Sequence, residues 1–173
     1  GAFLFLYARP GEKRKGGRKM EDLLYVIPAG TGKKEILAKL KKHPEIKFVS
    51  LVGIDLAGND TDEKIPIRIF QKDIDDFYAG TAVQTDGSSV VLTGIATLNN
   101  AKVDMPVDPG VNWFVDYNDE HIDEETGKPV GTLRIPAFLI HEKKRVDSRA
   151  ILKDTLDFVK KEMLKLFKKP GKV

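Results

Sequence analysis

The sequence predicts an α+β domain, and three features indicate this class. Segments with strand character follow one another in pairs, whereas a parallel α/β protein would alternate strand and helix. Two amphipathic helical segments stand apart from these pairs, one early in the chain and one at its end. No segment repeats another. We therefore expect a sheet wrapped partly around a helix.

The first helix is expected over residues 32–43. Its apolar residues recur at helical spacing and lysines cover the opposite face. Thr31 is the expected N-cap, and Pro44 ends the helix. The apolar face consists of Ile36, Leu37 and Leu40.

A hairpin is expected next. Residues 46–55 are rich in apolar and β-branched residues, and residues 64–70 read as the returning strand. Residues 57–60 form the turn between them. Pro66 is compatible with an edge strand or a bulge, because it cannot donate a ladder hydrogen bond.

A short acidic helix, residues 73–78, should follow and end at Gly80. We expect a turn at residues 85–89, then an apolar segment at residues 90–92 and a long irregular loop up to Pro109.

Two further strands are expected at residues 112–117 and 132–140, separated by an acidic connection at residues 119–125. The last element is a long helix over residues 148–167, with Ser148 as its N-cap. Its apolar stripe consists of Leu152, Leu156, Val159, Met163, Leu166 and Phe167.

The composition is that of a globular protein. The chain has 173 residues, of which 41% are hydrophobic and 32% charged, enough for one domain with a substantial core. The absence of cysteine excludes disulfides and thiolate metal sites, which fits a cytoplasmic protein. No apolar run reaches the ~20 residues of a membrane helix, and the start of the chain lacks the charge order of a signal peptide.

The positive charge of the chain is local. Six basic residues lie between Arg9 and Lys19, against the single acid Glu12, and the rest of the chain is slightly acidic. We expect residues 1–19 to form a flexible basic leader. Because the charge is not spread over a face, a nucleic-acid partner is not expected.

Two segments partly match known ligand-binding motifs, but each lacks residues that its motif requires. Residues 29–34 resemble the end of a phosphate-binding loop, but Ile27 replaces its first glycine and Lys34 its hydroxyl residue. Residues 116–127 begin like a calcium loop, but Gly127 stands where the final glutamate belongs. A solvated acidic loop is the expected structure there.

The histidines and the tryptophan are given structural roles. His43, His121 and His141 lie in separate elements without metal-ligand spacing, so we expect exposed loop or strand-end histidines. Trp113 lies in an expected strand and should pack in the core, although a base-stacking surface is an alternative.

Asp86-Gly87-Ser88-Ser89 is the strongest candidate site. Glycine permits a tight turn, and the two hydroxyls can fix a carboxylate in its charged form by hydrogen bonding. On its own, the cluster is compatible with an ordinary turn.

The order of segments around this cluster resembles that of bacterial glutamine synthetases. The segments that carry the resemblance are Ile46-Lys47-Phe48-Val49-Ser50, Ile65-Pro66, Asp75-Asp76-Phe77-Tyr78-Ala79-Gly80, Asp86-Gly87-Ser88-Ser89, Val103-Asp104-Met105-Pro106 and Val146-Asp147-Ser148-Arg149-Ala150-Ile151-Leu152-Lys153. The resemblance covers about residues 20–168. It implies a β-grasp-like domain over residues 20–147, and residues 148–173 would lead by a helix into a catalytic domain.

The resemblance also implies a function. In the family, the aspartate of this motif binds ammonium in a neighbouring subunit's active site and helps to remove its proton. That role falls on Asp86, and Ser88 and Ser89 would order or line the same loop. The family's ATP and its Mg²⁺ or Mn²⁺ ions are held by the catalytic domain, so no cofactor is expected in this chain.

This chain is therefore expected to be inactive alone and to act within a homo-oligomeric ring. It departs from the family after the motif, where Val91, Leu92 and Thr93 replace the usual aromatic and basic residues. The alternative is a stand-alone β-grasp module that binds or regulates another protein without catalysis.

Overall fold

The computed structural model describes residues 22–86, 90, 92 and 102–167. Within them the chain forms a mixed α+β fold of the β-grasp type, as the sequence predicted. The main sheet has the order β1-β6-β7-β2-β3. Its strands are β1 (Val26–Ile27), β6 (Trp113–Ile122), β7 (Pro129–Pro136), β2 (Ile46–Val52) and β3 (Glu63–Pro66).

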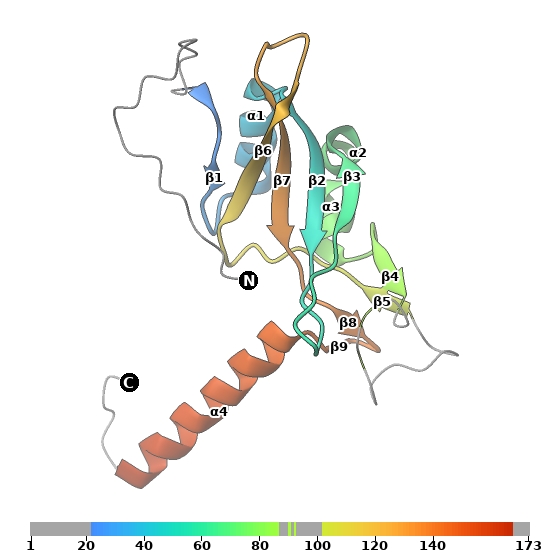
Figure 1. Cartoon of the computed structure of the whole chain (residues 1–173). Helices are drawn as coiled ribbons and strands as arrows, with labels where there is room; N and C mark the ends of the chain where they lie inside the picture. The colour runs from blue at the N-terminus through green and yellow to red at the C-terminus, as the bar shows by residue number, and fades with distance from the viewer. Residues whose placement is uncertain (1–21, 87–89, 91, 93–101, 168–173) are drawn as a thin grey trace.

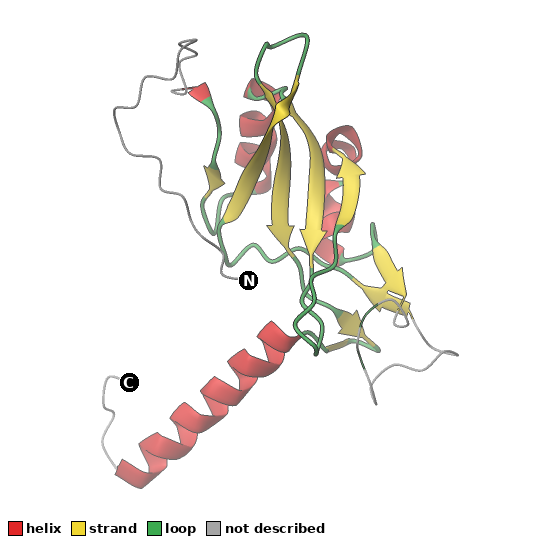
Figure 2. Ribbon diagram, in the orientation of Figure 1, coloured by secondary structure: helices red, strands yellow, loops and turns green. Residues whose placement is uncertain are grey.

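Strand β2 runs parallel to β7, and the other neighbours in this sheet are antiparallel. Helices α1 (Lys33–Lys42), α2 (Ile67–Lys72) and α3 (Ile74–Ala79) cover one face of the sheet (Figures 1 and 2).

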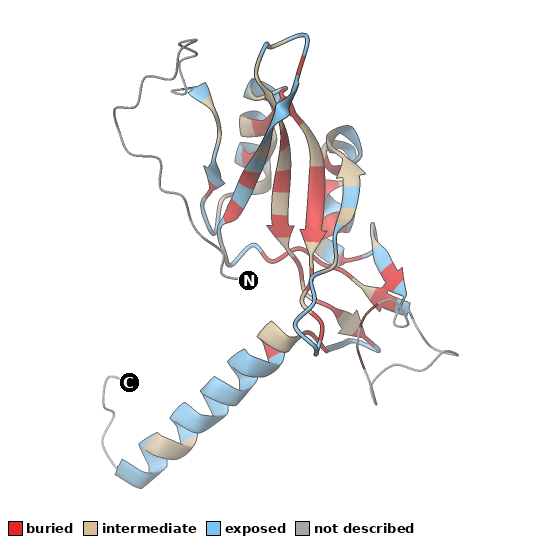
Figure 3. Cartoon of the chain, viewed as in Figure 1, coloured by how far each residue is buried: buried red, intermediate tan, exposed pale blue. Residues whose placement is uncertain are grey.

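The core lies between this face and the helices, where strand residues alternate between buried and partly exposed positions (Figure 3). In β7, Leu133 and Ile135 are fully buried. Phe70 of α2 lies edge-on to Phe77 of α3, with ring centroids 5.0 Å apart, and to Trp113 at 6.3 Å. The core position expected for Trp113 is thus confirmed.

A second, smaller sheet lies beyond one end of the main sheet (Figure 1). Its order is β4-β5-β8-β9, and the strands are β4 (Gln84–Asp86), β5 (Lys102–Asp104), β8 (Ile140–His141) and β9 (Lys144–Arg145). The long irregular loop expected before Pro109 therefore contains a strand, β5.

Helix α4 (Ser148–Phe167) has the predicted bounds and extends away from both sheets (Figure 1). Within this helix, Ala150 is the buried residue. Large apolar side chains are therefore exposed along it: Ile151, Leu152, Leu156, Phe158, Val159, Leu164, Leu166 and Phe167.

The returning strand of the first hairpin is shorter than predicted. It ends at Pro66, and α2 begins at Ile67. Residues 67–70 are apolar and β-branched enough to suit a strand, but the helical turn buries Phe70 against the α3 aromatics. Pro66 lies in the edge strand β3, as expected. Likewise the strand expected over 132–140 is divided, because β7 ends at Pro136 and β8 begins at Ile140.

Both expected N-caps are wrong by one residue. Gly32 precedes α1 without a side-chain cap, and the Thr31 hydroxyl instead donates to the Pro28 carbonyl at 2.6 Å. At α4, Asp147 caps the helix: its Oδ1 accepts from the Ala150 N–H at 2.8 Å. Aspartate suits this position because its carboxylate also interacts favourably with the positive end of the helix.

Candidate functional site

The candidate site is a row of polar side chains on the small sheet. In the β4–β5 pair, Gln84 lies opposite Asp104 and Asp86 lies opposite Lys102. Directly opposed residues, and residues two apart in a strand, share a face of a sheet. These four side chains therefore line one face, and all except the half-buried Asp104 are exposed.

The opposite face of the same strands is buried. Thr85 is 7% exposed and Val103 is fully buried. Val90 and Leu92, which follow β4 in the chain, are buried as well. The polar row is therefore presented from a pair of strands that is packed on its other face.

Backbone hydrogen bonds join the segment after β5 to α3 and to the main sheet. Val107 N–H donates to the Phe77 carbonyl of α3 at 3.1 Å, and Asp108 N–H donates to the Pro136 carbonyl of β7 at 2.7 Å. Gly80 ends α3 in a left-handed conformation with φ of 81°, as predicted. The chain can therefore turn there and enter β4 while passing close to Pro106.

Asp86 does not lie in a turn, as the sequence suggested, but is the last residue of β4. Thr85 and Asp86 both pair with β5, and the alternation of side chains along β4 then places Thr85 on the buried face. Asp86 remains exposed at the end of the strand. Ser88 and Ser89, the other candidate residues, lie outside the described residues.

Lys102, Asp104 and Gln84 were not identified from the sequence as site residues. The Gln84 amide donates to Asp104 Oδ1 at 2.9 Å, and the Lys102 ammonium lies 3.9 Å from the same oxygen. A partial signal was present: residues 102–104 alternate polar, apolar, polar, whereas residues 84–86 are all polar. Strands this short are hard to recognise without their partners.

His141, in the neighbouring strand β8, contacts the backbone of this row at Lys102. The residue is 5% exposed, and its Nδ1 lies 3.0 Å from the Lys102 carbonyl oxygen, to which a protonated Nδ1 would donate. The expectation of exposed histidines is thus wrong for His141, because β8 lies beside β5 in the interior of the small sheet. His121, in β6, is exposed as expected.

An acidic hollow of ≈ 370 Å³ adjoins β4. Thr85 and Val90 form one wall, and the β2–β3 connection forms the other. Two of its carboxylates have partners within the protein: Asp55 accepts from the Ala57 and Asn59 amides, each at 2.9 Å, and Asp60 lies 3.7 Å from Arg134. Because Thr85 lies on the face of β4 opposite Gln84 and Asp86, the hollow is separate from the polar row.

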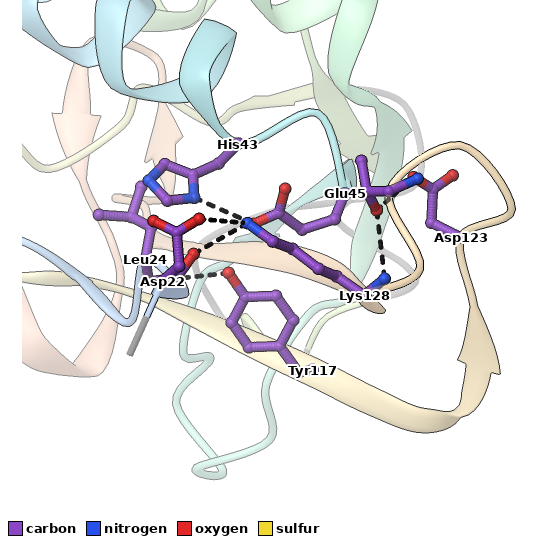
Figure 4. Close-up of polar contacts among 8 residues, drawn as sticks. Asp22, Leu24, His43, Glu45, Tyr117, Asp123 and Lys128 are labelled. Atoms are coloured by element: carbon purple, nitrogen blue, oxygen red, sulfur yellow. Dashed lines mark hydrogen bonds and ion pairs between the residues drawn. The ribbon is translucent and has the colours of Figure 1, made fainter. Parts of the chain in front are cut away.

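A second polar cluster lies at the other end of the main sheet, near the β6–β7 hairpin (Figures 1 and 4). Glu45 is fully buried, with Oε1 3.0 Å from His43 Nδ1 and 3.7 Å from Lys128 Nζ. Lys128 also donates to the Asp22 carbonyl at 3.0 Å (Figure 4). Burial raises the pKa of the nearby Tyr117 phenol, and the charge on Glu45 raises it further. We assign these contacts to anchoring the segment before β1.

Two classes of site are not found in the part of the chain that the structure describes. No group of three or more histidine, aspartate or glutamate side chains there is arranged to hold a metal ion. None of the helices in those residues is both long and apolar enough to cross a membrane.

Comparison with known proteins gives a likeness of fold. No protein-family model and no curated protein sequence matches the chain. The cryo-EM structure of Plasmodium falciparum glutamine synthetase superposes on 78% of this chain with a TM-score of 0.56 and 20% identity, and 23% of that chain is covered.

Two structures of GmaS are also similar, at lower scores. A complex with ADP gives a TM-score of 0.42 over 64% of this chain at 19% identity, and covers 21% of that chain. The form without ligand gives 0.41 over 63% at 18% identity, and covers 22% of that chain. The chain therefore spans less than a quarter of the length of the structures it resembles.

Proposed function

We propose that this chain is the N-terminal domain of a glutamine synthetase and supplies an ammonium-binding carboxylate, Asp86, to an active site on a neighbouring subunit. The observation that carries the proposal is the placement of Asp86, exposed at the end of a strand whose other face is buried. The fold shared with the Plasmodium enzyme and the ordered motifs support it.

The chemistry requires a fixed negative charge. A carboxylate attracts the ammonium ion and can accept one of its protons. The ammonia so formed attacks the γ-carbonyl carbon of γ-glutamyl phosphate, and phosphate leaves as the C–N bond of glutamine forms. A carboxylate held on a backed strand is already oriented for this step, so little ordering is needed when the substrate binds.

The remaining parts of the site would come from elsewhere. ATP and the Mg²⁺ or Mn²⁺ ions would be held by the catalytic domain, and this chain would be inactive without it. Ser88 and Ser89 would order the loop after Asp86. In the assembled ring, the rest of the protein would cover the apolar side chains of α4 and so remove them from water.

The alternative is a β-grasp module that binds another protein without catalysis. The exposed apolar side chains of α4 favour this alternative as well, because such a surface commonly marks an interface. The two proposals differ at Asp86, which has no role in a module that acts through α4.

The test is Asp86→Asn in a protein that joins this chain to a glutamine synthetase catalytic domain. The amide keeps the shape of the side chain and removes its charge. Loss of a general base typically lowers a rate by ~10²–10⁴-fold. We therefore expect the rate of ammonia-dependent glutamine synthesis to fall at least about a hundredfold. The melting temperature and the ring assembly should stay unchanged.

Asp116→Asn is the matched control, because Asp116 is an exposed strand aspartate on the main sheet. It should leave the rate unchanged. Activity of the Asp86→Asn protein within about threefold of the parent, far short of the loss expected for a base, would assign Asp86 a structural role only.

A further inference from the structure

Lys102 stands directly across the β4–β5 ladder from Asp86. Opposed side chains in an antiparallel pair have Cβ atoms about 4.5–5.5 Å apart. The lysine side chain is 63% exposed, and its ammonium lies 3.9 Å from Asp104 Oδ1, too far for a hydrogen bond. A long, flexible side chain held this loosely can reach the carboxylates on both sides of it.

The backbone beneath this side chain is fixed. His141 bonds to the Lys102 carbonyl from β8, and Val103 is fully buried. Exchange of the lysine between the two carboxylates therefore requires only side-chain rotation. Asp104 is held in place by the Gln84 amide at 2.9 Å, so it remains available as the resting partner of Lys102.

The chemistry of the lysine head group matches that of the proposed substrate. A protonated ε-amine carries one positive charge and three N–H donors, as an ammonium ion carries one charge and four. Both are recognised by a carboxylate in the same way. A lysine beside an ammonium-binding aspartate is thus a competitor that is always present at high local concentration.

We propose that Lys102 acts as a tethered competitor for ammonium at Asp86 and that Asp104 limits the competition by holding the lysine ammonium away. This inference rests on the proposed function of Asp86. The ammonium affinity of the site would then depend on how Lys102 is distributed between contact with Asp86 and contact with Asp104.

The contact itself can be tested on this chain alone, by NMR of the Lys102 side-chain ¹⁵N–¹H signal, assigned by its loss in Lys102→Arg. We expect Asp104→Asn to shift the signal. Asp86→Asn should then shift it further in the Asp104→Asn background than in the parent. If Asp86→Asn leaves the chemical shift of this signal unchanged in both backgrounds, the lysine does not reach Asp86 and the inference is overturned.

The consequence is tested by the KM for ammonia at fixed pH, in the protein that joins this chain to a catalytic domain. Exposed cross-strand charge pairs couple weakly, so we expect Lys102→Gln to lower this KM by about two- to fivefold. Asp104→Asn should raise it by a similar factor, and the double variant should behave as Lys102→Gln does. The kcat should stay unchanged throughout.

Lys72→Gln is the matched control, because Lys72 also lies 3.9 Å from an aspartate, Asp73, but on α2. It should leave the KM unchanged, which separates a local contact from a change in net charge. If Asp86→Asn abolishes synthesis while Lys102→Gln leaves or raises the KM, the inference fails and the proposed function stands. If Asp86→Asn leaves synthesis intact, both fail.

Discussion

Asp147 joins α4 to the segment that carries Leu139. Its Oδ2 accepts from the Leu139 N–H at 3.2 Å while its Oδ1 caps the helix, and the residue is fully buried. One carboxylate thus accepts from two buried backbone N–H groups, one in α4 and one in the connection before β8. The small sheet and α4 share this connection, since β8 begins at the residue after Leu139.

Asp147→Ala should lower the free energy of unfolding by about 2–4 kcal/mol, because the helix cap is lost and two buried N–H groups are left without acceptors. Urea unfolding followed by circular dichroism measures this loss. Asp154→Ala is the control, since Asp154 is exposed on the same helix. A similar small effect from both variants would mean that water replaces the carboxylate at no cost.

Gly80 gives a second test of the connection to the small sheet. A Cβ at this residue would lie 2.8 Å from the Pro106 side chain, in a backbone conformation with φ of 81°. Gly80→Ala should cost about 2–4 kcal/mol, the sum of a left-handed alanine and a steric clash.

Gly58 is the natural comparison, because it has φ of 86° and open space where a Cβ would be. Gly58→Ala should cost only the conformational part, about 1–2 kcal/mol. The difference between the two unfolding free energies isolates the Pro106 contact. Equal losses would show that Pro106 moves aside without cost.

The stability of the hairpin end should depend on acid pH through Asp123. Its Oδ1 lies 2.7 Å from the Lys47 ammonium, and Thr126 donates to Oδ2 at 2.7 Å. The hydrogen bond from Lys47 is the main cause that lowers the pKa of Asp123, and the one from Thr126 is the next. A lowered folded pKa means that the stabilisation is present above the unfolded pKa and is lost as pH falls through the folded value.

Lys47→Met should therefore flatten the fall in urea midpoint between about pH 5 and pH 2, the range below and around an ordinary carboxyl pKa of ~4. The parent should lose stability more steeply over the same range. Lys34→Met removes the same charge from an exposed position on α1 and should leave the parent's slope intact. Parallel curves for all three proteins would show that the Lys47 contact does not form in solution.

The sequence by itself determined the elements whose periodicity is long or whose ends are marked. Helix α4 spans the predicted residues because its apolar stripe persists over many turns. Helix α3 ends at Gly80, where only glycine adopts the left-handed conformation easily. Strand β2 and the core position of Trp113 were likewise evident from a continuous apolar pattern.

Only the tertiary structure decided the short elements and the partners. Residues 67–70 suit a strand locally and become helical because Phe70 packs on Phe77. Strand β5 is three residues long and exists because β4 and β8 flank it. The position of Asp86 opposite Lys102 follows from the register of two segments separated in the chain. Local preferences in a few residues are too weak to fix such pairings, and the burial of Thr85 and Val103 on the shared face selects them.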